Sequence, residues 1–267
     1  MTNHTPGAAT YGAYGAVDDC FAQAGGGARF DWGPVGARRM AAGAACLVVV
    51  DVLSFTTSVT VAAEAGTRVF PYAWRDASAV AYAEERGAAL AVGRRAATPA
   101  SPWSLSPAAL RAAPFAPRLV LPSPNGSSIA AAAGDATVIA ACLRNASAVA
   151  RHLVRHGYGT ADRPVAVIAS GERWPDGSLR PALEDLLGAG AVLSALRREG
   201  GGPLSPEAAA SAACFEATPD PATAVADSAS GRELRAGGFS EDVAIATETD
   251  VCGIVPVLVD GAFTGSE

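Results

Sequence analysis

Short apolar runs alternate with alanine-rich stretches along most of the chain. Seven of these runs are continuous and rich in Val, Ile and Leu, a pattern typical of strands that are covered on both faces of a sheet. The strands we expect cover residues 46–53, 67–72, 88–92, 118–121, 137–141, 164–169 and 251–258.

The stretches between these runs have the length and composition of helices. We expect helices over residues 57–65, 76–86, 107–112, 127–133, 146–156, 182–198, 206–215, 231–236 and 241–248. Such repeated alternation predicts an α/β fold in three layers, with helices on both faces of a mostly parallel or mixed central sheet. Ligands of these folds bind at the carboxyl ends of the strands.

The two ends of the pattern suggest the domain organisation. Residues 1–27 are mostly small and polar without periodicity, which predicts a flexible N-terminal tail. Residues 28–267 are then expected to form a single α/β domain. The run Gly200-Gly201-Gly202-Pro203 is the most linker-like segment, and a break between sub-domains would fall at residues 200–203.

The charged residues exclude several classes of protein. All 20 cationic residues are Arg, so Lys-dependent phosphate loops and Schiff-base chemistry are absent. The net charge is −6 and the Arg residues are scattered, which argues against a nucleic-acid partner. Arg38-Arg39 before an apolar run resembles an export signal, but the run stops at Asp51. Because no stretch has the ~20 apolar residues that span a bilayer, we expect a cytoplasmic protein without membrane contact.

The first candidate site follows the most apolar run. Asp51 directly follows three valines and precedes the hydroxyl-rich segment that contains Ser54, Thr56 and Thr57. A carboxylate at a strand end can hold a divalent cation, while hydroxyls and amides at a helix start can bind an anion. The alternative is that these side chains only cap the following helix.

Two further segments place polar groups after expected strands. Asn125-Gly126-Ser127 favours a turn whose amides and hydroxyls point one way, either as a phosphate site or as ordinary turn chemistry. Glu172 and Arg173 follow the strand at 164–169, and Glu184 and Asp185 fall in the first turn of the next helix. Neighbouring helical residues point ~100° apart, so we expect only one of these two acids to face the site.

Several of these segments in sequence order resemble the 2-phosphosulfolactate phosphatase family over roughly residues 45–260. The segments that carry the resemblance are Asp51-Val52-Leu53 with Thr56-Thr57, Asn125-Gly126-Ser127, Asn145, Gly171-Glu172, the run from Leu183 to Gly190, Ser230-Gly231-Arg232 and Asp242. The resemblance implies a three-layer α/β/α fold and Mg²⁺-dependent hydrolysis of 2-phospho-3-sulfolactate to sulfolactate and phosphate, on a route to coenzyme M. It also implies that polar residues around metal and substrate are Asp51, Asn125, Glu172, Glu184 and Asp185.

Two departures from the family pattern leave the substrate open. The chain has Ser54-Phe55 where the family usually has Arg-Ala, and Gly93-Arg94-Arg95 where the family tends to have Gly-Glu. A cation is thus lost at one position and gained at another. One interpretation is that the positive charge has moved within the site.

The working hypothesis is Mg²⁺-assisted hydrolysis of a small, acidic phosphate monoester. We expect the catalytic residues to be Asp51, Glu172, Glu184 and Asp185. Of these, Asp51, Glu172 and Asp185 would be the candidate ligands of Mg²⁺. The phosphoryl oxygens would contact Ser54, Thr56, Thr57, Asn125, Gly126 and Ser127, and the second acid group of the substrate would contact Arg144, Arg173 or Arg232.

Other interpretations remain open at this stage. A non-catalytic anion-binding or regulatory protein could retain the same fold. A phosphatase of the haloacid-dehalogenase type would need a second aspartate two residues after Asp51, where the chain has Leu53. Alanine-rich helices on an open sheet also favour pairing, so a homodimer is a further expectation.

Overall fold

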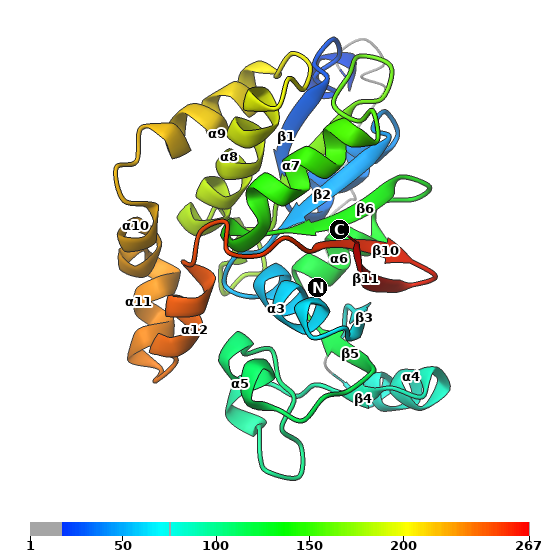
Figure 1. The fold of residues 1–267 in the computed structure, drawn as a ribbon, viewed down its shortest axis with the longest axis vertical. Helices are drawn as coiled ribbons and strands as arrows, with labels where there is room; N and C mark the ends of the chain where they lie inside the picture. The colour runs from blue at the N-terminus through cyan, green and yellow to red at the C-terminus, as the bar shows by residue number, and fades with distance from the viewer. Residues whose placement is uncertain (1–17, 75, 267) are drawn as a thin grey trace, which may run out of the picture.

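A nine-stranded sheet forms the centre of the molecule in the computed structural model, which describes residues 18–74 and 76–266 (Figure 1). The order of the strands is β1-β7-β2-β6-β10-β11-β3-β5-β4. Their bounds are β1 Ala28–Trp32, β2 Cys46–Val50, β3 Arg68–Tyr72, β4 Ala89–Leu90, β5 Arg118–Pro122, β6 Thr137–Ala141, β7 Val165–Ala169, β10 Val255–Val259 and β11 Ala262–Ser266. A separate two-stranded sheet pairs β8 Glu172–Arg173 with β9 Leu179–Arg180.

The large sheet consists of two parallel groups of strands. β1, β7, β2 and β6 are parallel, and Val48 in β2 lies between Val167 in β7 and Ile139 in β6. β3, β5 and β4 form the second parallel group. The hairpin of β10 and β11 joins the groups through antiparallel pairs with β6 and β3, so the two groups run in opposite directions. The expected three-layer α/β/α fold with a mixed, mostly parallel sheet is confirmed.

Side chains of β2 alternate between two cores, one on each face of the sheet. Cys46, Val48 and Val50 pack toward α7, α8 and α9, whereas Leu47 and Val49 pack toward α2, α3 and α6. The helices are α1 Asp18–Phe21, α2 Gly33–Ala41, α3 Phe55–Glu64, α4 Ser78–Arg86, α5 Pro107–Ala112, α6 Gly126–Ala131, α7 Ala146–Arg155, α8 Leu183–Arg198, α9 Pro206–Glu216, α10 Pro221–Asp227, α11 Ala229–Ala236 and α12 Ser240–Ala246, with short 3₁₀ turns η1 Arg94–Ala96 and η2 Leu143–Asn145. A β-strand buries alternate residues on opposite faces, which explains why β2 is apolar throughout.

Sequence signals fix the starts of several helices. Ser106, Ser205, Asp220 and Ser228 each accept a backbone N–H in the first turn of the helix that follows. Proline occupies the first turn of α2, α5, α9 and α10, where its missing N–H removes no helical hydrogen bond.

The segment at residues 200–203 connects α8 to α9, which pack against each other on one face of the sheet. The Gly202 N–H donates to the Gly159 carbonyl, and the Gly27 N–H donates to the Pro203 carbonyl. Of the expected tail, residues 1–17 lie outside the described residues. The packed structure begins before residue 28, because Gln23 also exchanges two hydrogen bonds with the Phe30 backbone.

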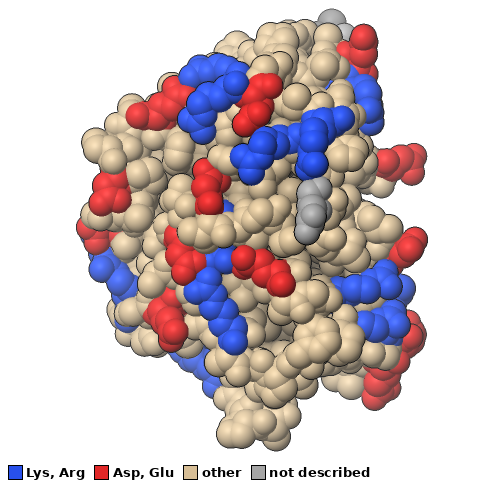
Figure 2. All heavy atoms as spheres, viewed as in Figure 1, with Lys and Arg blue, Asp and Glu red and all other residues tan. Residues whose placement is uncertain are grey.

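The outer surface has a mixed charge. Acidic and basic side chains are interspersed over the face drawn in Figure 2. None of the helices in the described part of the chain is long and apolar enough to cross a membrane.

Candidate functional site

Asp51 lies where β2 ends, and two backbone amides hold its carboxylate. Oδ1 accepts the Phe55 N–H from the start of α3 at 3.0 Å, and Oδ2 accepts the Gly126 N–H from the start of α6 at 3.2 Å. Two helices that follow different strands therefore begin at one carboxylate. The Asp51 residue is only 8 % exposed.

Asp185 is held in the same way from the start of α8. Its Oδ1 accepts the Val52 N–H at 2.7 Å and its Oδ2 accepts the Gly171 N–H at 2.8 Å. Glu184 is also buried, and its Oε2 accepts a hydrogen bond from the Ser228 hydroxyl at 3.2 Å. The expectation that one of the two acids would be solvated was wrong, because α10 packs against α8 and Ser228, which follows α10, binds Glu184.

Glu172 is less buried than these three acids, and it lies in β8 of the two-stranded sheet. Its Oε2 accepts a hydrogen bond from the side-chain amide of Asn125 at 3.2 Å. The same Asn125 accepts one from Arg173 Nε at 3.2 Å. The segment after β5 is thus joined to the segment after β7, as the sequence predicted.

The four carboxylates lie close enough to perturb one another. Burial, and then the charges of Asp51 and Glu184, raise the pKa of Asp185 well above its ordinary value. Burial and the same two charges raise the pKa of Glu172 to about 7, although Arg180 opposes the shift. Burial also raises the pKa of Asp51, against the Phe55 amide and the charge of Arg94. The cluster concentrates negative charge that a bound cation would stabilise.

Two of the predicted phosphate-binding hydroxyls have other partners. Thr56 Oγ1 donates to the Asp51 carbonyl at 2.8 Å, and Thr57 Oγ1 donates to the Val52 carbonyl at 2.8 Å. The single hydroxyl proton of each is therefore used by a main-chain carbonyl and is not directed at a ligand. These threonines instead hold the turn between β2 and α3.

Ser127 and Ser170 show the opposite behaviour. Both hydroxyls are buried, and neither has a hydrogen-bond partner among the described residues. Ser127 lies in the first turn of α6, and Ser170 directly follows β7. Burial of a hydroxyl without a hydrogen-bond partner costs free energy. Both hydroxyls could regain that free energy by binding a ligand that enters the site.

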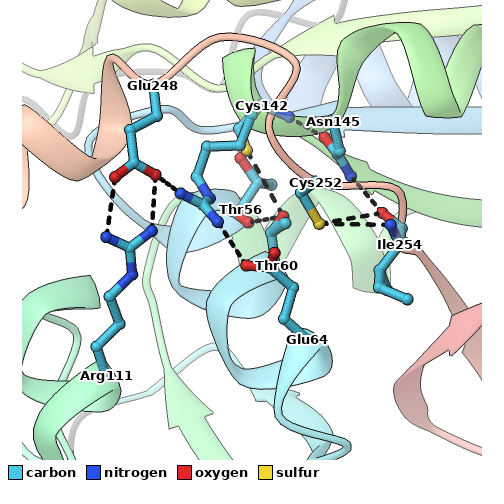
Figure 3. Close-up of polar contacts among 10 residues, drawn as sticks. Thr56, Thr60, Glu64, Arg111, Cys142, Asn145, Glu248, Cys252 and Ile254 are labelled. Carbon is cyan, nitrogen blue, oxygen red and sulfur yellow. Dashed lines mark hydrogen bonds and ion pairs between the residues drawn. The ribbon is translucent and has the colours of Figure 1, made fainter.

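Arg144, an expected contact of the substrate, is buried and bound by two glutamates. Its guanidinium is 2 % exposed and contacts Glu64 at 2.5 Å and also Glu248, which Arg111 binds from the other side (Figure 3). Arg144 therefore ties the end of α3 to the segment after α12. Arg232, the other distant candidate, is exposed on α11.

Sequence analysis missed two arginines that lie near the carboxylates. Arg94 interacts electrostatically with Asp51, and Arg180 with Glu172. Arg94 comes from η1, which follows β4 of the large sheet, and Arg180 comes from β9 of the two-stranded sheet. Only the change at Gly93-Arg94-Arg95 in the sequence hinted at the first of them.

A cavity of about 370 Å³ opens beside this cluster. Asn125, Ser170, Glu172 and Arg173 line one part of it, and Trp32 and other residues around α2 line another. A cavity of this size suits a small molecule. Glu172 lines the cavity, so a molecule bound there would lie against this carboxylate.

The side chains in the cluster suit a hard cation by their chemistry. All four acids offer oxygen atoms, which Mg²⁺ prefers, and the crowded charge favours a cation. Within residues 18–74 and 76–266, however, no group of three or more His, Cys, Asp or Glu is arranged to hold a metal ion. A third protein ligand beside Asp51 and Asp185 would therefore require reorientation of another carboxylate, such as that of Glu172.

A family model described as 2-phosphosulpholactate phosphatase matches residues 36–261. The match includes Asp51, Asn125, Glu172, Glu184 and Asp185. No curated protein matches the chain.

Proposed function

Because the chain belongs to the 2-phosphosulpholactate phosphatase family of phosphoric monoester hydrolases, we propose that it hydrolyses a small, acidic phosphate monoester with Mg²⁺. The observation that carries the proposal is the convergence of four acids of the matched range, Asp51, Glu172, Glu184 and Asp185. One of them, Glu172, lines a small cavity. The family substrate, 2-phospho-3-sulfolactate, is the first compound to test. Its products would be 3-sulfolactate and phosphate.

Asp51 and Asp185 would hold the cation. Backbone amides fix both carboxylates at the ends of β2 and β7, and each oxygen retains a second lone pair. A bound Mg²⁺ supplies charge stabilisation for the phosphoryl group. Glu184, held by Ser228, adds negative charge behind these two acids.

Glu172 would accept the proton of the attacking water. Asn125 donates to Oε2, and Oε1 accepts no hydrogen bond from the described residues, so it can take that proton. Glu172 lines the cavity and is the most exposed of the four acids. A pKa of about 7 suits a proton acceptor near neutral pH. As the new bond between the water oxygen and phosphorus forms, the ester P–O bond breaks, and the departing alkoxide takes up a proton from solvent to leave as the alcohol.

The phosphoryl oxygens would contact groups at the starts of α3 and α6. Ser127 has a buried hydroxyl without a partner, and Asn125 already binds Glu172 at the mouth of the cavity. Ser54 lies at the start of α3 beside the Asp51 carboxylate. Arg173, fixed by Asn125 and the Gly177 carbonyl, would meet the second acid group of the substrate.

Substitution of Asp51 by Asn tests the proposal. Phosphate release from a panel of phosphorylated hydroxy acids should require Mg²⁺, and Asp51→Asn should lower kcat by about 10³-fold or more, in the range seen for essential groups. Mg²⁺ should also raise the Tm of the wild type but not that of the variant. Asp227→Asn is the matched control, since the side chain of Asp227 is 62 % exposed on α10.

The outcomes separate an enzyme from a binding protein. If wild-type protein releases no phosphate from any monoester yet is stabilised by these compounds, it is an anion-binding protein and the proposed hydrolysis is wrong. Equal turnover by the wild type and Asp51→Asn would remove Asp51 from the mechanism.

A further inference from the structure

Arg94 reaches the candidate site from a segment that lies outside the large sheet. It begins η1, in the long connection between β4 and α5. Its Nε donates to Asp242 Oδ2 at 2.9 Å, and its Nη2 donates to Ser54 Oγ. The guanidinium also lies 5.9 Å from the centre of the Phe239 ring. The Arg94 guanidinium is therefore held by two hydrogen bonds, and the Phe239 ring lies against one of its faces.

Asp242 is suited to holding an arginine in place. It is 1 % exposed on α12, and its other oxygen accepts the Ser106 hydroxyl at 2.5 Å and the Ala108 N–H at 3.2 Å. A buried carboxylate with this many donors is a fixed anchor. Because Ser106 and Ala108 begin α5, Asp242 orients Arg94 and α5 together.

The other contact of Arg94 lies at the centre of the site. Ser54 precedes Phe55, whose N–H binds Asp51, and the charge of Arg94 acts on Asp51 itself. The guanidinium thus lies where β2 ends and α3 begins. This is the end of α3 at which backbone N–H groups favour an anion.

Part of the guanidinium remains available for a ligand. Arginine has five N–H donors, and only two hydrogen bonds are made from Arg94 to described residues. Its side chain is 17 % exposed, so one edge can be reached from solvent. If Arg94 served only to connect Asp242 with Ser54, its guanidinium would need neither an exposed edge nor a position close to Asp51.

We propose that Arg94 binds an oxygen of the substrate phosphoryl group and selects for a dianionic phosphate at this site. The inference rests on the proposed function and adds a residue to it. Arg94 is prepositioned by Asp242, so little conformational entropy is lost when the anion binds. Arg95, the next residue, is exposed and provides a matched control.

The test is calorimetric titration with inorganic phosphate in the presence of Mg²⁺, which does not depend on turnover. Arg94→Ala should weaken phosphate binding about 10-fold or more, Arg94→Lys should restore part of it, and Arg95→Ala should bind as the wild type does. Where a monoester is hydrolysed, Arg94→Ala should also lower kcat/KM about 10²-fold, with a corresponding rise in the inhibition constant of phosphate. Thermal unfolding of each variant shows whether it is folded, and Arg94→Gln replaces Arg94→Ala if the latter is not.

The outcomes distinguish this inference from the proposed function. Equal phosphate affinity of wild type, Arg94→Ala and Arg94→Gln overturns the role of Arg94, even if monoesters are hydrolysed. A wild type that binds no phosphate also overturns it. Loss of phosphate binding in Arg94→Ala, in a protein that hydrolyses nothing, supports the role of Arg94 while the proposed hydrolysis fails.

Discussion

At Asp51 and Asp185 the carboxylates are positioned by main-chain amides rather than by other side chains. The amides come from Phe55, Gly126, Val52 and Gly171. Main-chain groups at element ends are fixed by the fold, so these two acids keep their orientation without a network of flexible partners. The same arrangement makes activity sensitive to small changes in the backbone.

Gly126 is the position at which this sensitivity is greatest. A Cβ at residue 126 would overlap the Phe55 ring and lie 3.0 Å from Asp51 Oδ2. We expect Gly126→Ala to displace the start of α6 and to lower kcat/KM by about 10²-fold, as a displacement of ~1 Å does. Gly253→Ala is the control, since a Cβ there meets nothing within 4 Å. Steady-state kinetics beside thermal unfolding would test this, and unchanged kcat/KM in a folded Gly126→Ala variant would contradict it.

At the scale of elements, continuous apolar runs were reliable indicators of strands. β2 was predicted to extend to residue 53 but ends at Val50, because Asp51 begins the turn that Thr56 holds. β1 was missed because Arg29 and Asp31 interrupt its pattern. Arg29 binds the carbonyls of Gly26 and Gly43, and Asp31 accepts the N–H of Trp32. Local pairing of this kind cannot be read from hydropathy.

Helix α2 and strand β11 were missed for different reasons. α2 contains two glycines and a proline, which weaken any helical pattern. β11 contains a glycine and two hydroxyl residues, and antiparallel pairing with β10 and β3 places it in the sheet. Both depend on contacts with distant parts of the chain.

The positions of the acids were predictable because they follow strands or begin a helix. The contact between Gly126 and Asp51 has a further cause, since β5 and β2 belong to groups that run in opposite directions. Packing of α6 against β2 brings the two together. Arg94 was noted in the sequence as a gained cation, but its contacts with Ser54 and Asp242 join segments far apart in the chain and could not be predicted. Arg180 lies in a two-residue strand without a periodic pattern.

Arg144 gives a prediction about the connection of α3, η2 and the segment after α12. Arg144→Ala removes a buried guanidinium with its contacts to Glu64 and Glu248. The two glutamates remain about one-third exposed and can hydrate, so we expect a loss of ~2–3 kcal/mol of stability. The exposed pair of Arg197 and Glu216 is the control, for which Arg197→Ala should cost less than ~1 kcal/mol. Urea unfolding measures both, and equal losses would contradict the structural role of Arg144.

At the scale of the whole molecule, the β10–β11 hairpin is the only link within the large sheet between its two parallel groups, as far as the described residues show. Phe263 in β11 is fully buried, pairs with Val69 and packs edge-on against Phe55 at a ring distance of 6.2 Å. It thereby connects the hairpin with the first residue of α3. Stability and the candidate site are coupled through this ring.

Phe263→Ala tests that coupling. Removal of a buried phenylalanine costs ~3–5 kcal/mol, which lowers Tm by ~6–20 °C in a protein of this size. Val259→Ala in the same hairpin is the control. Val259 is 48 % exposed, so this substitution should lower Tm only slightly. Differential scanning calorimetry would show the difference, and a Phe263→Ala variant that unfolds like the control would contradict the importance of the link.

The place of that hairpin in the chain has a consequence for biosynthesis. β6 and β3 are translated well before residues 255–266, yet each acquires one of its two neighbours in the sheet only from this later segment. While the polypeptide is still on the ribosome, both strands keep an unpaired edge of the kind that promotes aggregation. Nascent chains of this protein should therefore depend on chaperones until those last strands emerge.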